Sequence, residues 1–488
     1  MQFRDMTHAV IILSHGDFDM LYKLVEYFSA DCRVFIHVDA KTPIPEDVRE
    51  SFLSLKQVAF IGQKYNVHWG GFSILKTEIF MLKKALKDTN ADYFHLISGQ
   101  DYPIRPLSDF LAFFDGKETD FMQYVHLPHP RWNGNTFARF QYFYPYDLCD
   151  NKDKGNRWCD KWVEVQKKFG FKRRIPDCFD HLYGNSQWFS ICRKSVRYLV
   201  DYTTLHPKLF RRMRMTFAPE ESYVSTVLVN NPDKQPIVSE NLRFILWKYE
   251  NGNMPANLGI EHFRGLLEWN CFFARKMARH CSLPLISAID RYLLHDAEIE
   301  MTETGGWVYP GFLKYHFDKS FCDFVCGLWG EASLASGIDF GCGAGHYVAV
   351  WRERGLRFKG YDANPHTPEL SKLLTKDGNP LCGVADLTDD LSVNRPFDIV
   401  ICKDVLNYIP QKLQPKAISN LAMLSARYVL LSWHTDENTG SQIENPIDEM
   451  TLVSEFEKCG FVIDNHFTFS IRLALRQKDC CVFCKKEV

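Results

Sequence analysis

The sequence predicts an α/β protein with two domains built on mostly parallel sheets, and three observations support this. Short apolar runs alternate with amphipathic stretches from residue 8 to about residue 275, a rhythm typical of βαβ units. A second series of the same kind begins at Ser336. The chain has 488 residues, which is more than one hydrophobic core normally organises.

The first elements follow from the spacing of apolar residues. Ala9–Leu13, Val34–Val38 and Tyr93–Ile97 are short apolar runs and predict strands. Met20–Phe28 is amphipathic, and Ile74–Leu86 repeats apolar residues at helical spacing, so both predict helices. Helices between successive strands favour a parallel sheet covered on both faces.

The middle of the chain is less regular. Residues 126–185 are rich in Trp, Tyr, Pro and basic residues, and we interpret them as an insertion or an acceptor-side lobe. Residues 277–332 contain helical stretches without strand signals, with breaks at Gly305-Gly306 and Pro310-Gly311. The expected organisation is a first domain over residues 1–280, a helical connector over 281–330 and a second domain over 331–488.

The second domain repeats the alternation of strands and helices. Its expected strands are Gly337–Phe340, Phe358–Tyr361, Phe397–Ile401 and Tyr428–Leu431. Its expected helices lie around Tyr347–Arg354 and Lys412–Leu424.

Composition narrows the function classes. Apolar residues make up 46% of the chain and charged residues 24%, and the net charge of −2 gives no reason to expect nucleic acid or an anionic membrane as the main partner. No run approaches the roughly 18 to 20 apolar residues of a membrane span, and the N-terminus lacks the pattern of a signal peptide. We therefore expect a cytoplasmic protein with reduced thiols, and a location at the inner face of a membrane stays open. Cys480, Cys481 and Cys484 make only a weak case for a metal site.

A glycine-rich run opens the second domain. Gly341, Gly343 and Gly345 follow the predicted strand that contains Asp339, and glycines at such a turn let an adenosyl ligand approach the backbone. Asp362 ends the next strand, where an acid can accept both ribose hydroxyls. Asp386 falls where an acid commonly contacts the adenine amino group. These residues predict S-adenosylmethionine (SAM) binding. The alternative is a nicotinamide site, whose phosphate-binding loop would have the sequence pattern GxGxxG.

In order and spacing, residues 330–488 resemble the class I SAM-dependent methyltransferases, which have a Rossmann-like fold. Methyl transfer to a hydroxyl needs alignment and a base. The candidates for the base are Lys403, Asp404 and His434. A structural or surface histidine is an equally good interpretation of His434.

Six unusual strings occur in order in the first half. They are His68-Trp69-Gly70-Gly71-Phe72-Ser73, His95-Leu96-Ile97-Ser98-Gly99-Gln100-Asp101-Tyr102-Pro103, Tyr183-Gly184-Asn185-Ser186-Gln187-Trp188, Ala218-Pro219-Glu220-Glu221-Ser222-Tyr223, Arg243-Phe244-Ile245-Leu246-Trp247-Lys248-Tyr249 and Phe273-Ala274-Arg275-Lys276. Across residues 8–278 the chain resembles glycosyltransferase family 14, the core-2/I-branching β-1,6-N-acetylglucosaminyltransferases and peptide O-xylosyltransferases. The resemblance implies a GT-A type fold and inverting, metal-independent transfer from a UDP-sugar.

The resemblance also implies roles for individual residues. Glu221 matches the family's catalytic base, while its neighbour Glu220 would point about 100° away on a helix. Lys276 matches the lysine that neutralises the departing diphosphate. Arg243 or Arg264 would supply the second positive charge. The simpler alternatives are helix-terminal acids and a solvated basic segment.

Further contacts are expected around this site. Trp247 and Tyr249 match the family's acceptor-side aromatics, with a half-buried strand pair as the alternative. His15, Asp39 and Asp101 follow predicted strands, where donor contact and turn capping are equally good interpretations.

The sequence therefore predicts a bifunctional glycan-modifying enzyme. One domain would transfer a sugar, GlcNAc or xylose, from a UDP-sugar to a glycan or glycoconjugate hydroxyl, and the other would transfer methyl from SAM. The absence of an anchor favours a bacterial setting, such as surface polysaccharide synthesis, and leaves peripheral membrane association open. The alternative is a glycosyltransferase with a non-catalytic SAM-binding regulatory domain. No metal is expected.

Overall fold

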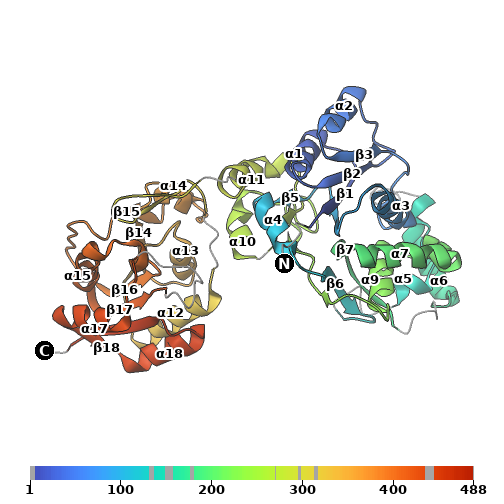
Figure 1. Cartoon of the computed structure of the whole chain (residues 1–488). Coiled ribbons are helices and arrows are strands. Elements are labelled where there is room, and N and C mark those ends of the chain that lie inside the picture. Colours follow the sequence, from blue (N-terminus) through green and yellow to red (C-terminus); the bar gives the residue numbers. More distant parts are fainter. Residues whose placement is uncertain are drawn as a thin grey trace. The chain divides into compact units, whose positions relative to one another are not determined.

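The computed structural model describes residues 6–130, 137–148, 158–175, 181–269, 271–294, 298–312, 317–434 and 445–486. It contains two compact units (Figure 1): residues 1–259 with 270–286, and residues 260–269 with 287–488. The expected separate connector over 281–330 is not a unit of its own. Its first residues belong to the first unit, and the remainder packs with the second unit.

The first unit is organised around a seven-stranded sheet of order β3-β2-β1-β4-β7-β6-β8. Its strands are β1 (His8–Ser14), β2 (Arg33–Val38), β3 (Val58–Gly62), β4 (Tyr93–Ser98), β6 (Asp120–His126), β7 (Tyr183–Cys192) and β8 (Ile237–Val238). Strands β1 to β4 run parallel, whereas β7 is antiparallel to both β4 and β6. The three strands predicted from the first half are confirmed, each extended by one or two residues.

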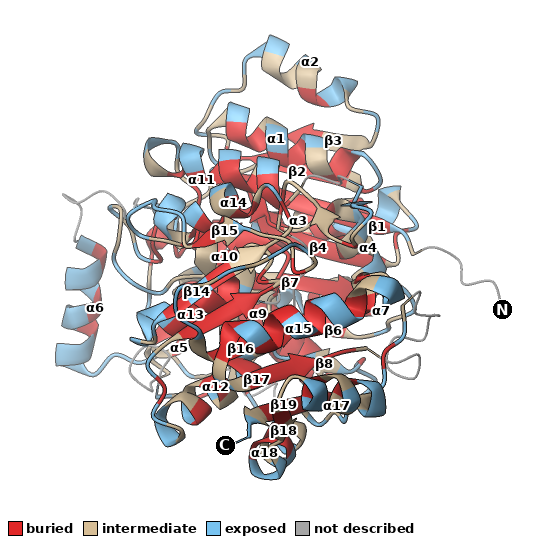
Figure 2. Ribbon diagram, turned by 90° about the vertical axis from the view of Figure 1, so that its left-hand side faces the viewer, coloured by how far each residue is buried: buried red, intermediate tan, exposed pale blue. Residues whose placement is uncertain are grey.

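Helices cover both faces of this sheet because alternate residues of each strand point to opposite sides. In β1, Val10 and Ile12 pack in one core with α1 (Phe18–Ser29), α2 (Glu46–Ser54) and α4 (Leu107–Phe114). Ala9 and Ile11 pack in the other core with α3 (Phe72–Asp88), α7 (Arg193–Leu205), α8 (Pro207–Arg212) and α9 (Glu220–Val229). Figure 2 shows the strands almost wholly buried and the helices exposed on their outer sides.

A small second sheet lies in the same unit. It joins β5 (Tyr102–Pro103), β10 (Phe273–Arg275) and β9 (Arg243–Ile245) in that order. The irregular region contains α5 (Ala138–Gln141) and α6 (Trp158–Phe169). In α6, Cys159 is disulfide-bonded, which departs from the expectation that the thiols are reduced.

The second unit has a sheet of order β15-β14-β13-β16-β17-β19-β18. Its strands are β13 (Gly337–Phe340), β14 (Phe358–Asp362), β15 (Cys382–Val384), β16 (Phe397–Lys403), β17 (Ser425–Ser432), β18 (Phe461–Ile463) and β19 (Cys480–Lys485). β19 pairs antiparallel with both β17 and β18, and the other neighbouring strands of this sheet pair parallel. A short pair, β11 (Glu300–Met301) and β12 (Trp307–Val308), precedes the sheet.

Helices again cover both faces. α15 (Gln414–Leu424) and α17 (Glu449–Lys458) pack on one face, and α12 (Lys319–Glu331), α13 (His346–Glu353) and α18 (Asn465–Leu475) pack on the other. α14 (Thr367–Lys372) follows β14, and α10 (Phe263–Glu268) comes from the segment before β10. α11 (Arg279–Tyr292) crosses the boundary between the units. All four strands predicted for this half are confirmed.

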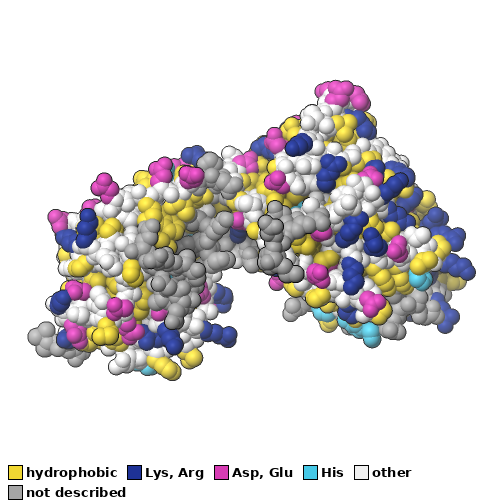
Figure 3. Space-filling model, viewed as in Figure 1, with side chains coloured by type: hydrophobic (Ala, Val, Ile, Leu, Met, Phe, Trp, Pro, Cys, Tyr) yellow, Lys and Arg dark blue, Asp and Glu magenta, His cyan; other side chains and the backbone are white. Residues whose placement is uncertain are grey.

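Charge is unevenly distributed on the first unit. On the face shown in Figure 3, Lys and Arg side chains gather over the region where Figure 1 places α3 and α7. The near-zero net charge of the chain therefore conceals a locally basic surface. Among the described residues, no helix combines the length and apolarity that crossing a membrane requires.

Candidate functional site

The carboxyl ends of neighbouring strands bring several predicted residues to one edge of the first sheet. The amide of Asp39, directly after β2, donates to the carbonyl of Ser14 at the end of β1 (2.8 Å). The amide of Met277, after β10, donates to the carbonyl of Gln100, after β4 (2.9 Å). This contact brings the half-buried Lys276 to the same edge. Ligands bind at such edges in parallel sheets, so the arrangement suits a donor site.

Asp39 organises the loop beside this edge. Its Oδ1 accepts hydrogen bonds from the amides of Lys41 (3.1 Å) and Val67 (3.0 Å), and the residue is 5% exposed. His15 is exposed directly after β1, and its carbonyl accepts a hydrogen bond from Thr42 Oγ1 (3.0 Å). The capping role expected as one alternative for Asp39 is present, and donor contact by either residue stays a prediction.

Asp101 lies in a buried charged cluster below the edge. Arg243 Nε donates to Asp101 Oδ2 (3.3 Å), and Arg275 Nη1 lies 3.2 Å from Asp101 Oδ1. The Arg275 guanidinium stacks on the Trp188 ring at 4.3 Å. Burial lowers the pKa of Arg243 to about 10 and also lowers that of Arg275. The sequence strings that contain Trp188, Arg243 and Arg275 therefore meet the string that contains Asp101 in this cluster.

This burial bears on two predicted donor contacts. The side chains of Asp101 and Arg243 are both 0% exposed, and Arg243 Nη2 donates to the carbonyl of Leu96 (2.6 Å). The two residues therefore support the edge of the sheet from beneath, because a ligand at the surface does not reach them in this conformation.

Arg264, the alternative diphosphate arginine, belongs to the second unit. Its guanidinium pairs there with Glu268 (3.2 Å) and Glu353 (2.8 Å). Two carboxylates thus already neutralise this arginine within its own unit.

The segment leading into α9 packs on the glycine turn before α3. The Ala218 amide donates to the carbonyl of Gly70 (2.8 Å). Gly70 has φ +71°, and a Cβ there would lie 2.7 Å from the Phe217 ring, so both conformation and space require glycine. The half-exposed Trp69 contacts Phe217 edge-on, with ring centroids 5.7 Å apart. Another two of the six strings meet at this point.

Glu221 lies in the first turn of α9 and pairs with a residue that the sequence did not single out. Arg139 of α5 places Nη1 2.5 Å from Glu221 Oε2. The Arg139 side chain is 9% exposed and its guanidinium lies 4.7 Å from the Phe217 ring, whereas the Glu221 side chain is 30% exposed. The carboxylate is therefore oriented from one side and reachable from the other, as a base requires.

Glu220 occupies a different environment from its neighbour. It is 5% exposed, and its Oε2 has no hydrogen-bond partner among the described residues. Burial, together with the charge of Glu221, raises the pKa of Glu220. Burial also raises the pKa of Glu78 in α3, with a further contribution from Glu220. The two adjacent glutamates thus differ as expected, with Glu221 facing outward.

Trp247 and Tyr249 follow β9 and project into solvent. They are 67% and 71% exposed, so the half-buried strand pair considered as an alternative is absent. Exposed aromatic rings suit stacking on a sugar, and this role stays a prediction.

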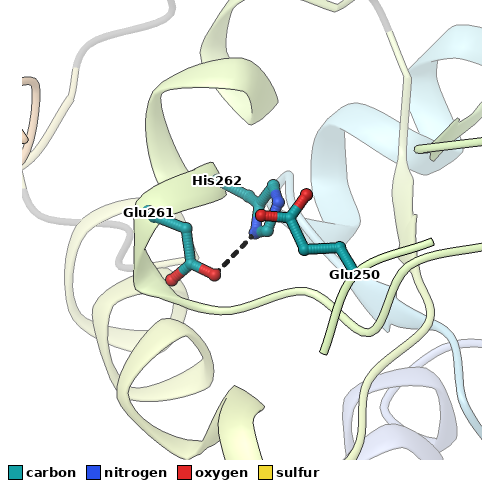
Figure 4. A group of neighbouring side chains, drawn as sticks. All are labelled: Glu250, Glu261 and His262. Atoms are coloured by element: carbon teal, nitrogen blue, oxygen red, sulfur yellow. Dashed lines mark ion pairs between the residues drawn. The ribbon is translucent and has the colours of Figure 1, made fainter. Parts of the chain in front are cut away.

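Carboxylates and a histidine are drawn in Figure 4. Glu261 and His262 are neighbours in a short 3-10 helix (Ile260–His262) of the second unit, with 3.5 Å between Glu261 Oε1 and His262 Nδ1. Glu250 belongs to the first unit, where it pairs with Lys248 at 3.2 Å. Each pair is satisfied within its own unit, and neither constitutes a metal site by itself.

The glycine run of the second unit forms a tight turn between β13 and α13. Gly341, Gly343 and Gly345 have φ of +83°, +55° and +86°. A Cβ at Gly341 would lie 2.2 Å from Val405 Cγ2, whereas a Cβ at Gly343 would meet nothing within 4 Å. The turn is therefore packed on one side and open on the other, which fits close approach by an adenosyl ligand.

The predicted acids lie at the ends of the neighbouring strands. Asp362 Oδ2 accepts a hydrogen bond from the Gly343 amide (2.7 Å), and Oδ1 accepts one from Asn364 (2.8 Å). Asp386 Oδ2 accepts a hydrogen bond from Thr304 Oγ1 (2.6 Å). Thr304 comes from the expected connector, which thus contributes to the neighbourhood of the predicted adenine acid.

Asp339 and the residues after β16 complete the site. Burial, reinforced by the charge of Asp362 and opposed by Lys403, raises the pKa of the 3%-exposed Asp339 to about 7. Asp404, with φ +58°, pairs with Lys403 and accepts a hydrogen bond from Ser432 Oγ (2.6 Å). Burial acts to raise the pKa of Asp404, but these partners outweigh it and the pKa is lowered.

His434 is the third predicted base. Its Nε2 lies 4.0 Å from Asp404 Oδ1, and its amide donates to Asn407 Oδ1 (2.8 Å). The structure thus brings Lys403, Asp404 and His434 together at the carboxyl ends of β16 and β17.

The sequence did not point to two residues that contact the predicted site residues. Arg139 lies in the irregular region, where no periodicity marks it, and Thr304 lies next to a Gly-Gly break. Only the clustering of basic residues in 126–185 could have drawn attention to Arg139.

Family models match both halves of the chain. The core-2/I-branching enzyme model matches residues 9–266, which is more than half of the chain. A methyltransferase domain model matches residues 313–464.

Curated relatives match more than half of the chain. Xylosyltransferase 1 of Canis lupus familiaris is 26% identical over 316 residues, covering 58% of this chain and 30% of the relative. Xylosyltransferase 2 of Rattus norvegicus is 27% identical over 280 residues, covering 53% and 30%. The chain thus spans about a third of the length of these relatives.

Solved structures match about a third of the chain. Magnesium protoporphyrin IX methyltransferase of Synechocystis is 18% identical, with a TM-score of 0.27, covering 34% of this chain and 82% of that one. An amino pentose methyltransferase of Micromonospora echinaspora is 11% identical, with a TM-score of 0.28, covering 35% and 91%.

Proposed function

Because this chain belongs to the core-2/I-branching enzyme family and carries a methyltransferase domain after it, we propose that it is a bifunctional glycan-modifying enzyme. The first unit transfers a sugar from a UDP-sugar to a hydroxyl with inversion at the anomeric carbon. The second unit transfers a methyl group from SAM. Both reactions serve the assembly of one surface polysaccharide or glycoconjugate.

The sugar transfer rests on one observation, the half-exposed Glu221 carboxylate held by Arg139. In the proposed step, Glu221 takes the proton of an acceptor hydroxyl as the hydroxyl oxygen bonds to the anomeric carbon. The bond from that carbon to the diphosphate breaks on the opposite face, and the diphosphate leaves with the electron pair. Arg139 orients the carboxylate toward the acceptor throughout.

Lys276 is the proposed partner of the departing diphosphate. It lies at the edge where β1, β2 and β4 end, joined there by the hydrogen bond from Met277 to Gln100. A cation at that place stabilises negative charge as it develops, so the proposed reaction needs no divalent ion. The second cation stays unassigned, because Arg243 is buried and Arg264 is paired within the second unit.

Xylose is the sugar we favour, with GlcNAc as the second candidate. The relatives reported above are named xylosyltransferases, which supports xylose. The exposed rings of Trp247 and Tyr249 would stack on a sugar of the acceptor.

A pair of matched variants tests the base. Glu221→Gln should abolish UDP release from UDP-xylose or UDP-GlcNAc in the presence of acceptor, since an amide cannot accept the proton. Glu220→Gln is the control and should retain activity, because that neighbour is buried. Full activity of Glu221→Gln would remove the proposed mechanism.

For methyl transfer, the residues present fit SAM. The turn is open above Gly343, Asp362 ends β14, and Asp386 follows β15. SAM, when bound, supplies an electrophilic methyl group. Asp404, oriented by Ser432 and Lys403 and lying near His434, is placed to take a proton from a hydroxyl acceptor.

Labelled SAM and the isolated glycan product test this second activity. Methyl incorporation that Asp404→Asn reduces, with SAM affinity unchanged, would support catalysis. SAM binding with no incorporation into any glycan product would instead favour a regulatory domain.

A further inference from the structure

Helix α6 is attached to the first unit by one face. Cys159, Val163 and Gln166 are buried, and they recur at helical spacing. The Gln166 side chain accepts a hydrogen bond from the Phe143 amide (2.8 Å) and donates to the Phe143 carbonyl (3.0 Å). In Figure 2, α6 lies at the left edge, with buried residues on its inner side and exposed residues on its outer side.

An apolar stripe occupies an outward part of the same helix. Trp158, Trp162, Val165 and Phe169 are 44%, 43%, 40% and 65% exposed. At about 100° per residue these four side chains fall within a band about 60° wide, next to the buried face and separate from it. We call these four residues the α6 stripe. Phe171, 61% exposed just beyond the helix, continues it.

Basic residues border the stripe on its solvent side. Lys161 and Lys168 are the nearest neighbours around the helix, and both are exposed. The acids Asp160 and Glu164 lie farther round. Because these acids lie farther from the stripe than Lys161 and Lys168 do, the border of the stripe is positively charged.

More positive charge follows the helix. Lys172 and Arg174 are exposed, whereas the intervening Arg173 is anchored on the carbonyl of Met215 (2.5 Å). Cations therefore border the stripe both along the helix and at its C-terminal end.

We infer that the α6 stripe docks the first unit on the interface of a membrane that contains anionic lipids. A helix with Trp and Phe on one face and Lys beside them is the type that lies in the headgroup region. The flexible stems of Lys161 and Lys168 would let their amines reach lipid phosphates while the rings enter the acyl boundary. Charge complementarity selects an anionic bilayer over a neutral one. The inference concerns binding alone and does not depend on the proposed reactions.

Vesicle co-sedimentation of the full-length protein tests this. Phosphatidylcholine vesicles are compared with vesicles containing roughly one third phosphatidylglycerol. The unaltered protein should prefer the anionic vesicles. Trp162→Ser with Phe169→Ser should weaken that binding at least about tenfold, and Lys161→Glu with Lys168→Glu should abolish the preference for anionic lipid.

Matched controls exist in the second unit. Phe469→Ser with Leu473→Ser alters another exposed apolar pair on one helix, each 70% exposed, and Lys319→Glu with Lys412→Glu alters two exposed lysines. Both controls should bind as the unaltered protein does, and circular dichroism checks folding. Unchanged binding by Trp162→Ser with Phe169→Ser would overturn the inference. Failure of the unaltered protein to bind either kind of vesicle would also overturn it. In that case, sedimentation equilibrium would show whether the unaltered protein self-associates, and loss of self-association in Trp162→Ser with Phe169→Ser would assign the α6 stripe to a protein contact.

Discussion

Arg139 Nη1 lies 2.5 Å from Glu221 Oε2, and this ion pair joins the irregular region to the first turn of α9. Phe217 supports the pair from below, since the Arg139 guanidinium lies 4.7 Å from its ring. The carboxylate keeps a 30% exposed side chain, so it is oriented without being enclosed. Arg139 contacts the carboxylate of the proposed base and not the substrate, so its proposed role is to hold that carboxylate in position during the reaction.

Arg139→Ala should therefore lower kcat for sugar transfer by about 10²-fold while changing the donor KM little. The loss should arise because the carboxylate is no longer held toward the acceptor. Arg139→Lys, which keeps the charge, should recover part of the activity. Steady-state UDP release measures both, with Lys167→Ala on the exposed side of α6 as a control. Equal kcat for Arg139→Ala and the unaltered protein would show that the pair is structural only.

Glu78 should make the first unit less stable as pH rises. Burial raises the pKa of Glu78, so in the folded state it keeps its proton at pH values where the unfolded chain, with a pKa near 4.5, has lost it. Between those two pKa values the folded state binds more protons, so the free energy of unfolding falls with increasing pH. Each unit between them corresponds to about 1.4 kcal/mol.

Glu78→Gln should therefore flatten the loss of protection that accompanies a rise in pH above the pKa of the unfolded chain. Hydrogen exchange of α3 and α9, corrected for the intrinsic effect of pH, measures this. Glu50→Gln, at an exposed site of α2, is the control. An unchanged slope in Glu78→Gln would mean that Glu78 ionises normally in the folded protein.

Gly341→Ala should destabilise the second unit more than Gly355→Ala does. Both glycines have nearly the same φ, +83° and +85°, so the conformational cost is shared. Only at Gly341 would the new Cβ meet another atom, Val405 Cγ2 at 2.2 Å. The added cost of overpacking should be about 1–3 kcal/mol, visible as a lower Tm of that unit.

Adding Val405→Ala should restore part of the stability of Gly341→Ala, because it removes the methyl groups in the way. A Tm for Gly341→Ala equal to that for Gly355→Ala would show that the turn can open without cost.

The sequence predicts features that depend on neighbouring residues, and it does not predict features that depend on residues far apart in the chain. The strands of both sheets and the glycine turn are set by local patterns, so Gly341 and the end of β13 were found where the periodicity indicated. The buried state of Asp101 and Arg243 depends on β4, β9 and β10 meeting, which no local pattern records. Arg139 and Glu221 are 82 residues apart, and their contact exists only after folding.

Burial and the charge of Asp362 raise the pKa of Asp339 to about 7. SAM should therefore bind more tightly as pH rises through this value. The sulfonium of SAM is a cation, so it favours the ionised carboxylate and lowers the pKa of Asp339 in the complex. Binding then releases a proton between the two pKa values, and Kd falls by at most about tenfold per pH unit for one proton. S-adenosylhomocysteine lacks the sulfonium charge and shares the amino group, so its affinity should change less. Calorimetry of both ligands in buffers of different ionisation enthalpy measures the proton release. Asp339→Asn should bring the two ligands to the same pH dependence, and a difference that survives in Asp339→Asn would assign the proton to another group.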